Sequence, residues 1–366
     1  MNRMILLNPG PVNVTDRVRK ALLHPDLCHR EPECAELVQS IRQKLLEAFG
    51  LEGVFLTALI TGSGTAALEM AVSSCVAEGQ AMLVVRNGVY GERIATMAES
   101  HSIPTVTVDC DWGVVPSLDA IERALKEHPE IGLVALVHHE TTTGLLNPVH
   151  EVGELAHRYG KKLLIDAISS LAGDTLDFER SHVDYCVGTA NKCLQGFPGV
   201  SFVLVRKEEI DSLATHPARS VYFDLNKNLK AQEAGETLFT PAVQVHYAFD
   251  AALDELIEET VTGRIKRYAG ASTLLRQGFN EMGLEYLVDP AHRSNSLTAI
   301  KLPEGITYEF LHDELKKQGY VIYAGQGGLK KSIFRIANMG DIQTGEFQRL
   351  LEVLKTCLAK SPSLRD

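Results

Sequence analysis

The stretch Leu163-Leu164-Ile165-Asp166, taken with the later tetrapeptide Thr189-Ala190-Asn191-Lys192, decides the fold. The apolar run predicts a buried strand, and Asp166 stands at its carboxyl end. In a mostly parallel sheet the carboxyl ends of the strands meet at one edge, where active sites lie. The sequence therefore predicts a carboxylate at that edge, with Lys192 following in the next strand-like segment.

A carboxylate and a lysine placed in this way suit pyridoxal phosphate (PLP) chemistry. PLP needs a lysine amine that holds it as a Schiff base. It also needs an anion beside its ring nitrogen, so that the protonated ring can draw electrons from a substrate. Since an Asp or a Lys alone is usually a solvated surface charge, the surrounding motifs must carry the interpretation.

Apolar runs alternate with helical stretches through the first two thirds of the chain. The runs lie at 54–60, 81–85, 104–108, 132–137, 162–165 and 200–205, and helical stretches lie at 35–49, 65–77, 91–100, 117–127 and 148–160. This alternation predicts an α/β fold whose large domain, residues 15–255, has a mostly parallel, doubly wound sheet.

The pattern changes after residue 255. Helical periodicity at 264–282, 307–318 and 343–359 mixes with strand-like runs at 296–301, 320–323 and 333–336. We expect a smaller C-terminal α+β domain over 256–366. Residues 1–14 form an N-terminal segment, in which Asn8-Pro9-Gly10-Pro11 is a rigid turn.

Composition limits the classes of function. The chain has 366 residues, 45% of them hydrophobic, and a net charge of −11 without clustered Lys and Arg, which argues against a nucleic-acid partner. The seven cysteines are odd in number and show no C-x-x-C spacing, so we expect reduced thiols, a cytoplasmic protein and no metal site. The opening apolar run is too short for a signal peptide or a membrane span.

The segment Thr61-Gly62-Ser63-Gly64-Thr65 joins a strand to a helix and suits phosphate. Its glycines let the backbone approach an anion, which the helix N-terminus then holds. An ordinary capped helix is one alternative. A dinucleotide fingerprint is another, because Gly62, Gly64 and Ala67 match G-x-G-x-x-A, and Arg86 could accept NADP. An NADP-dependent oxidoreductase would leave Asp166 and Lys192 without a role.

Three further motifs fit a PLP site, and each has a structural alternative. Tyr90 in Asn87-Gly88-Val89-Tyr90-Gly91 could stack on a planar ring, or be a half-buried turn residue. The hydroxyls of Glu140-Thr141-Thr142-Thr143-Gly144 could bind a phenolic oxygen, or the segment is a β-prone loop. Arg335, between Phe334 and Ile336, could clamp an acid group or form a structural salt bridge.

Together these motifs resemble fold-type I PLP enzymes of the class V aminotransferase group, over nearly the whole chain. Within that group the chain looks most like 2-aminoethylphosphonate:pyruvate transaminases. The stretches that carry this resemblance are His139-Glu140-Thr141-Thr142-Thr143-Gly144, Ala190-Asn191-Lys192-Cys193-Leu194-Gln195-Gly196 and Tyr320-Val321-Ile322-Tyr323.

The resemblance implies a role for each matching residue. Lys192 would be catalytic and bind PLP covalently, and Asp166 would pair with the pyridinium nitrogen. The remaining cofactor-binding residues would be Ser63, Gly64, Thr65, Tyr90, Thr141 and, from the partner subunit of a homodimer, Thr240. The substrate-binding residues would be Arg335, Arg30 and Gly10.

The segment Leu27-Cys28-His29-Arg30-Glu31-Pro32-Glu33 departs from the Cys-Thr-Trp-Asp type stretch of those transaminases. A related group is an ammonia-lyase acting on (R)-1-hydroxy-2-aminoethylphosphonate, and His29-Arg30-Glu31 could supply its general acid. Alanine:glyoxylate aminotransferases often have a His-Arg pair here too. Transamination of an aminophosphonate to pyruvate, giving alanine, and elimination of ammonia both yield phosphonoacetaldehyde. The sequence leaves both open, together with a non-catalytic PLP-binding protein.

Overall fold

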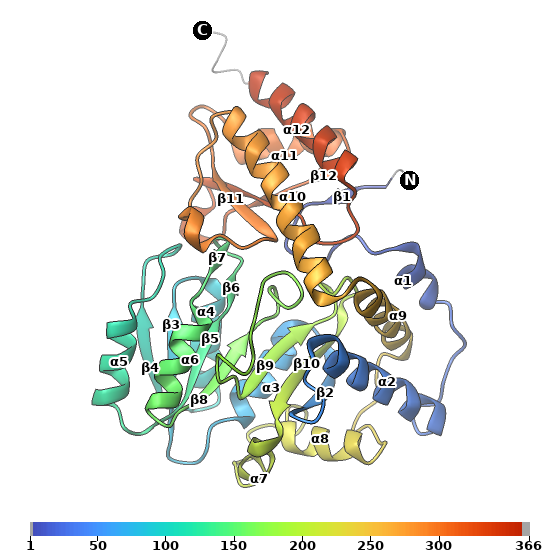
Figure 1. Ribbon diagram of the computed structural model, residues 1–366, viewed down its shortest axis with the longest axis vertical. Coiled ribbons are helices and arrows are strands. Elements are labelled where there is room, and N and C mark those ends of the chain that lie inside the picture. Colours follow the sequence, from blue (N-terminus) through green and yellow to red (C-terminus); the bar gives the residue numbers. More distant parts are fainter. Residues whose placement is uncertain (1–2, 361–366) are drawn as a thin grey trace.

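The computed structural model describes residues 3–360. Its larger part is built on a seven-stranded sheet (Figure 1). Across the sheet the order is β2 (Phe55–Gly62), β10 (Gly199–Arg206), β9 (Tyr185–Thr189), β8 (Lys162–Asp166), β5 (Ile131–Val137), β3 (Ala81–Arg86) and β4 (Thr105–Asp109). β10 is antiparallel to both of its neighbours, and the other pairings in this sheet are parallel. The predicted mostly parallel α/β sheet is confirmed.

Both faces of the sheet are buried, which explains the continuous apolar runs in the sequence. Along β5, Val134 and Leu136 enter one apolar cluster while Leu133 and Ala135 enter the other, because strand side chains alternate between faces. One face is covered by α1 (Asp16–Ala21), α2 (Pro32–Phe49), α5 (Leu118–Glu127), α6 (Val149–Arg158) and α9 (Val243–Glu259). The other is covered by α3 (Gly64–Ser74), α4 (Val89–Ser100), α7 (Ile210–Leu213) and α8 (Leu225–Glu233).

The smaller part lies at the upper end of Figure 1 and has its own apolar cluster. Its sheet has the order β11 (Leu297–Lys301), β14 (Ile333–Ala337) and β13 (Tyr323–Ala324), and its helices are α10 (Val261–Glu281), α11 (Tyr308–Lys317) and α12 (Thr344–Ala359). The N-terminal strand β1 (Ile5–Leu6) pairs with β12 (Tyr320–Val321), so this segment belongs to the same cluster. The domain boundary at 255 stays a prediction.

The structure differs from the sequence prediction at three places that matter for the site. Helix α4 begins at Val89, so Tyr90 lies in the first turn of a helix rather than on a loop. Strand β9 ends at Thr189, so Lys192 lies in the turn that follows rather than in a strand. A short hairpin of β6 (His139–Glu140) and β7 (Leu145–Leu146) adds structure to a segment predicted as a loop.

All seven cysteines are free thiols. Residues 3–360 contain no group of three His, Cys, Asp or Glu side chains that could hold a metal ion. In the same residues, every helix is too short or too polar to cross a membrane.

Candidate active site

The site lies where the parallel strands β3, β5, β8 and β9 end. Asp166 is the last residue of β8, and its carbonyl accepts a hydrogen bond from the backbone of His138, just beyond β5 (2.9 Å). The turn after β9 brings Lys192 to the same edge. The sequence reasoning from strand ends therefore places both residues in one region.

The amine of Lys192 lies against the N-terminal turn and donates a hydrogen bond to the carbonyl of Pro9. Gly10 has a φ of +94°, and a Cβ there would lie 2.6 Å from Cδ of Lys192. Gly10 is thus held beside the lysine, and its substrate-binding role stays a prediction. Burial lowers the pKa of Lys192 to about 8, opposed by the charges of Cys193 and Asp166. A lysine with this pKa has a substantial neutral fraction near physiological pH.

Asp166 is buried, with 3% of its surface exposed. Within residues 3–360 its side chain accepts one hydrogen bond, from the backbone amide of Ile168 (3.0 Å). Burial raises the pKa of Asp166 to about 6, and the positive charges of Arg93 and Lys192 partly oppose this increase. The carboxylate is ionised at neutral pH and its second oxygen faces no protein donor among the described residues, so it can take a cationic partner.

The predicted phosphate segment begins α3. Ser63 occupies the N-cap position, yet its hydroxyl accepts no hydrogen bond from the amides of the first turn. Gly64 approaches Ile168 so closely that a Cβ would lie 2.8 Å from its Cδ1. These features leave backbone amides and a hydroxyl at the positive end of a helix, an arrangement that binds anions.

Arg93 adds a positive charge to this segment, and the sequence reasoning missed it. Its guanidinium donates to Oγ1 of Thr65 (3.2 Å) and lies 4.8 Å from the ring centre of Tyr90. Tyr90 and Arg93 are three residues apart on α4, so they share one helix face. That spacing was a signal in the sequence, but it is informative only when Tyr90 is assigned to a helix.

Arg335 reaches the same region from β14. The guanidinium is buried and donates to the carbonyls of Thr141 (2.7 Å) and Ala324 (2.9 Å), and to Oε1 of Gln326 (3.3 Å). No carboxylate in residues 3–360 forms an ion pair with it, so the salt-bridge alternative is not realised. The hydroxyl of Thr141 is also buried and has no hydrogen-bond partner in these residues.

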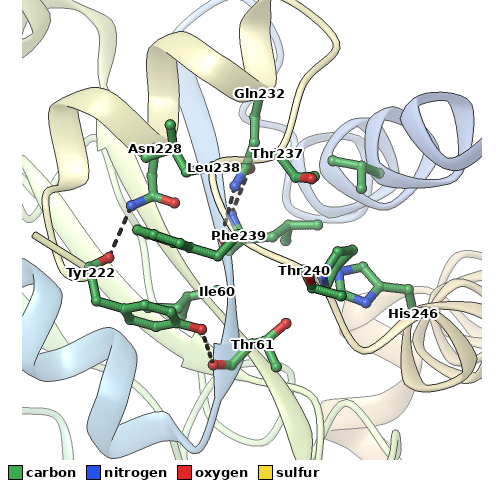
Figure 2. A pocket seen from close by; sticks show the side chains of 13 residues that line it. Ile60, Thr61, Tyr222, Asn228, Gln232, Thr237, Leu238, Phe239, Thr240 and His246 are labelled. Carbon is green, nitrogen blue, oxygen red and sulfur yellow. Dashed lines mark hydrogen bonds between the residues drawn. The ribbon is translucent and has the colours of Figure 1, made fainter. Parts of the chain in front are cut away.

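Two predicted residues lie apart from this group. Arg30 is exposed and donates to the carbonyl of Thr237 (3.3 Å), while Thr240 lines a small pocket near the end of β2 (Figure 2). The backbone amide of Ala242 donates to the hydroxyl of Thr61 (3.1 Å), which fixes this segment to that strand. In residues 3–360, no hydrogen bond joins Arg30 or Thr240 to Lys192.

The NADP interpretation loses support, because its arginine is already paired. Arg86 forms two hydrogen bonds with Asp109, Nε to Oδ1 (2.5 Å) and Nη2 to Oδ2 (2.7 Å), at the ends of β3 and β4. PLP fits better. The site has an anion for a ring nitrogen, a lysine of lowered pKa, a helix N-terminus for phosphate and, in Thr141, a buried hydroxyl without a partner.

Comparisons with known proteins agree with this geometry. The sequence profile of the aminotransferase class-V family matches residues 17–341. A relative from Salmonella heidelberg (strain SL476), named 2-aminoethylphosphonate–pyruvate transaminase, is 36% identical over 359 residues and 97% of each chain. A relative of the same name from Salmonella typhimurium is 35% identical over the same share.

Solved structures show the same fold. Aspartate aminotransferase of subgroup IV from Thermus thermophilus superposes with a TM-score of 0.89, at 29% identity over 98% of this chain and 99% of that one. Alanine–glyoxylate aminotransferase from Nostoc sp. gives a TM-score of 0.91, at 26% identity over 98% and 96% of the two chains. The predicted fold-type I architecture is confirmed, and the chain belongs to the aminotransferase class-V family.

Proposed function

We propose that this protein is a PLP-dependent transaminase that moves the amino group of 2-aminoethylphosphonate to pyruvate, giving phosphonoacetaldehyde and alanine. The observation that carries the proposal is the buried guanidinium of Arg335, which has no carboxylate partner in the described chain and lies in the region of Lys192 and Asp166. The printed names of the Salmonella relatives support the choice of substrates.

Several residues would hold the cofactor. Asp166 would pair with the ring nitrogen, Tyr90 would stack on the ring, and Thr141 would bind the ring oxygen. The phosphate would be bound by the first turn of α3 and by Arg93, at Ser63, Gly64 and Thr65. When bound, PLP supplies an electron sink that makes a Cα proton of the substrate acidic.

Lys192 moves the proton in this proposal. With a pKa of about 8, its amine accepts a proton more readily near neutral pH than a solvated lysine would, because more of it is neutral. The carbonyl of Pro9 accepts a hydrogen bond from the amine and keeps it beside Gly10. With a pKa of about 6, Asp166 is mostly ionised at neutral pH and so favours the protonated form of a cationic partner.

Arg335 would bind the acid group of the substrate. The carbonyls of Thr141 and Ala324 fix the plane of its guanidinium, so the remaining N–H groups point in fixed directions. Nη2 forms no hydrogen bond with residues 3–360, so its two N–H groups can donate charge-assisted hydrogen bonds to a phosphonate or a carboxylate. Burial strengthens these hydrogen bonds, because little water is present to compete for the same donors and acceptors.

A homodimer and a cytoplasmic location are also part of the proposal. Val221 is 81% exposed, and the stacked rings of Tyr222 and Phe239 (4.6 Å between centres) lie beside Thr240, which supports a second copy covering this face. Arg30 shares the face, so its predicted substrate role, like that of Thr240, would be exerted at the partner's site. Seven free thiols support a reducing compartment.

The test follows the nitrogen. The purified holoenzyme receives 2-aminoethylphosphonate with pyruvate, and separately (R)-1-hydroxy-2-aminoethylphosphonate without any keto acid; alanine and free ammonia are measured in both. Alanine from the first reaction supports the transaminase. Ammonia from the second reaction, with no alanine from the first, would replace it with the ammonia-lyase.

A further inference from the structure

Glu140 is a buried carboxylate to which neither the sequence motifs nor the proposed function gives a role. It ends β6 and is 0% exposed. Oε1 accepts hydrogen bonds from the amide (3.1 Å) and the hydroxyl (2.6 Å) of Thr142, and Oε2 accepts from the amides of Tyr90 (3.2 Å) and Gly91 (3.4 Å). An ionised carboxylate suits four donors, because it has acceptors alone.

These bonds cap a helix from a distant part of the chain. Tyr90 and Gly91 are the second and third residues of α4, whose amides an N-cap side chain would ordinarily satisfy. The N-cap residue of α4 is Gly88, which has no side chain. The hydroxyl of Thr142 accepts from the amide of Val89 (3.1 Å), so the first three amides of α4 all donate to the 140–142 segment.

Gly88 is required for this arrangement. A Cβ at that position would lie 2.2 Å from Cδ of Glu140, so a side chain there would displace the carboxylate. Two motifs that the sequence presented separately, Asn87–Gly91 and Glu140–Gly144, are therefore one structural unit.

The unit also reaches the substrate side of the site. Thr141 follows Glu140 directly; its buried hydroxyl has no partner in residues 3–360, and its carbonyl accepts from Nη1 of Arg335 (2.7 Å). One carboxylate thus fixes the turn that carries Tyr90 and the backbone that orients both the Thr141 hydroxyl and the Arg335 guanidinium.

We propose that Glu140 is a positioning residue, which holds Tyr90, Thr141 and Arg335 in one frame for the cofactor and the acid group of the substrate. This inference rests on the proposed function, because those three residues would contact PLP and substrate. The charged groups near Glu140 are Asp166 of β8 and Arg335 of β14. Burial, together with Asp166, raises the pKa of Glu140 to about 7 against its hydrogen bonds to Thr142 and Gly91.

The hydrogen bonds of Glu140 depend on its ionisation, and therefore on pH. Above pH 7 the carboxylate is ionised and accepts all four bonds. Below pH 7 it gains a proton, which must point at one of four donors, so at least one bond is lost. The hydrogen bonds of Glu140 to α4 and to Thr142 should weaken as the pH falls through about 7, and the affinity for PLP should fall with them.

The test is a PLP titration of the apoprotein between pH 5 and 9, for the wild type and for Glu140→Gln. At pH 8 the variant should bind PLP about tenfold more weakly, since an amide cannot satisfy all four donors. It should also lack the loss of affinity near pH 7, while keeping the losses near pH 6 from Asp166 and near pH 8 from Lys192. Hydrogen exchange at Tyr90 and Gly91, measured without cofactor, should be faster in the variant.

Two further variants separate positioning from general damage. Thr142→Val removes the hydroxyl but leaves the charge, so it should weaken PLP binding while keeping the step near pH 7; it also serves if Glu140→Gln does not fold. Asp184→Asn alters a buried carboxylate that accepts from the amide of Leu163 (2.7 Å), at the opposite edge of the sheet. It should leave the affinity for PLP unchanged.

An unchanged PLP affinity and pH profile in Glu140→Gln would overturn the inference. A wild type that does not bind PLP would overturn both the inference and the proposed function. If PLP binds but 2-aminoethylphosphonate does not react, the substrate proposal alone fails, because the titration contains no substrate.

Discussion

Replacing Arg335 with lysine tests the substrate clamp. Lysine keeps the charge but not the planar guanidinium, so it cannot bond both carbonyls and still place a donor where Nη2 of Arg335 lies. The carbonyls of Thr141 and Ala324 also lose the donors that lie 2.7 and 2.9 Å away. Losing one charge-assisted hydrogen bond to the substrate costs about 1.5–3 kcal/mol.

This free energy corresponds to a decrease in kcat/KM of roughly 10- to 100-fold for 2-aminoethylphosphonate. The assay is alanine formation at limiting substrate, alongside the visible absorbance of bound PLP, which should remain. Arg206→Lys is a matched control, because Arg206 is a largely buried arginine on β10 that bonds the carbonyl of Val183 away from the site. A kcat/KM within threefold of the wild type for Arg335→Lys would refute the clamp.

Three further predictions concern the cofactor site. Asp166→Asn should stabilise the apoprotein at pH 8 by up to about 3 kcal/mol, because burial disfavours the ionised carboxylate. The wild type loses this stability as the pH rises from about 4 to about 6, so urea unfolding at pH 4 and at pH 8 measures the effect. Gly10→Ala should prevent PLP attachment. The control is Gly53→Ala, which is also at positive φ (+78°) but has open space around it, so it should lower the free energy of unfolding by about 1 kcal/mol and leave PLP attachment intact. PLP absorbance and thermal unfolding distinguish the two variants. The rate at which the apoprotein attaches PLP should rise with pH and level off above about 8, as Lys192 becomes neutral; a rate that still rises steeply at pH 10 would contradict the lowered pKa.

The sequence predicted those parts of the site that depend on strand ends. Asp166 and Lys192 follow from the apolar runs, because parallel strands gather their carboxyl ends at one edge. Arg335 was predicted from its place in an apolar strand. The sequence could not decide between a ligand clamp and a structural salt bridge for Arg335, because that depends on whether a carboxylate from elsewhere in the chain lies beside it.

The parts that the sequence did not predict depend on contacts between distant segments. The sequence predicts a start of α4 at residue 91, because Gly88 has no side chain that could cap a helix. In the structure the cap comes from Glu140, far along the chain. Arg93 was missed for the same reason, since its contact with Tyr90 requires that helical turn. The sequence leaves Arg86 available for a cofactor, whereas the pairing of β3 with β4 places Asp109 beside it and satisfies its guanidinium.

The central claim is that Lys192 binds PLP covalently. The most direct measurement is to load the protein with PLP, reduce it with borohydride, digest it, and locate the pyridoxyl label by mass spectrometry. The account predicts a label on Lys192, and no label at the site in Lys192→Ala. A label on another lysine, or a Lys192→Ala protein that is labelled as fully as the wild type, would contradict it.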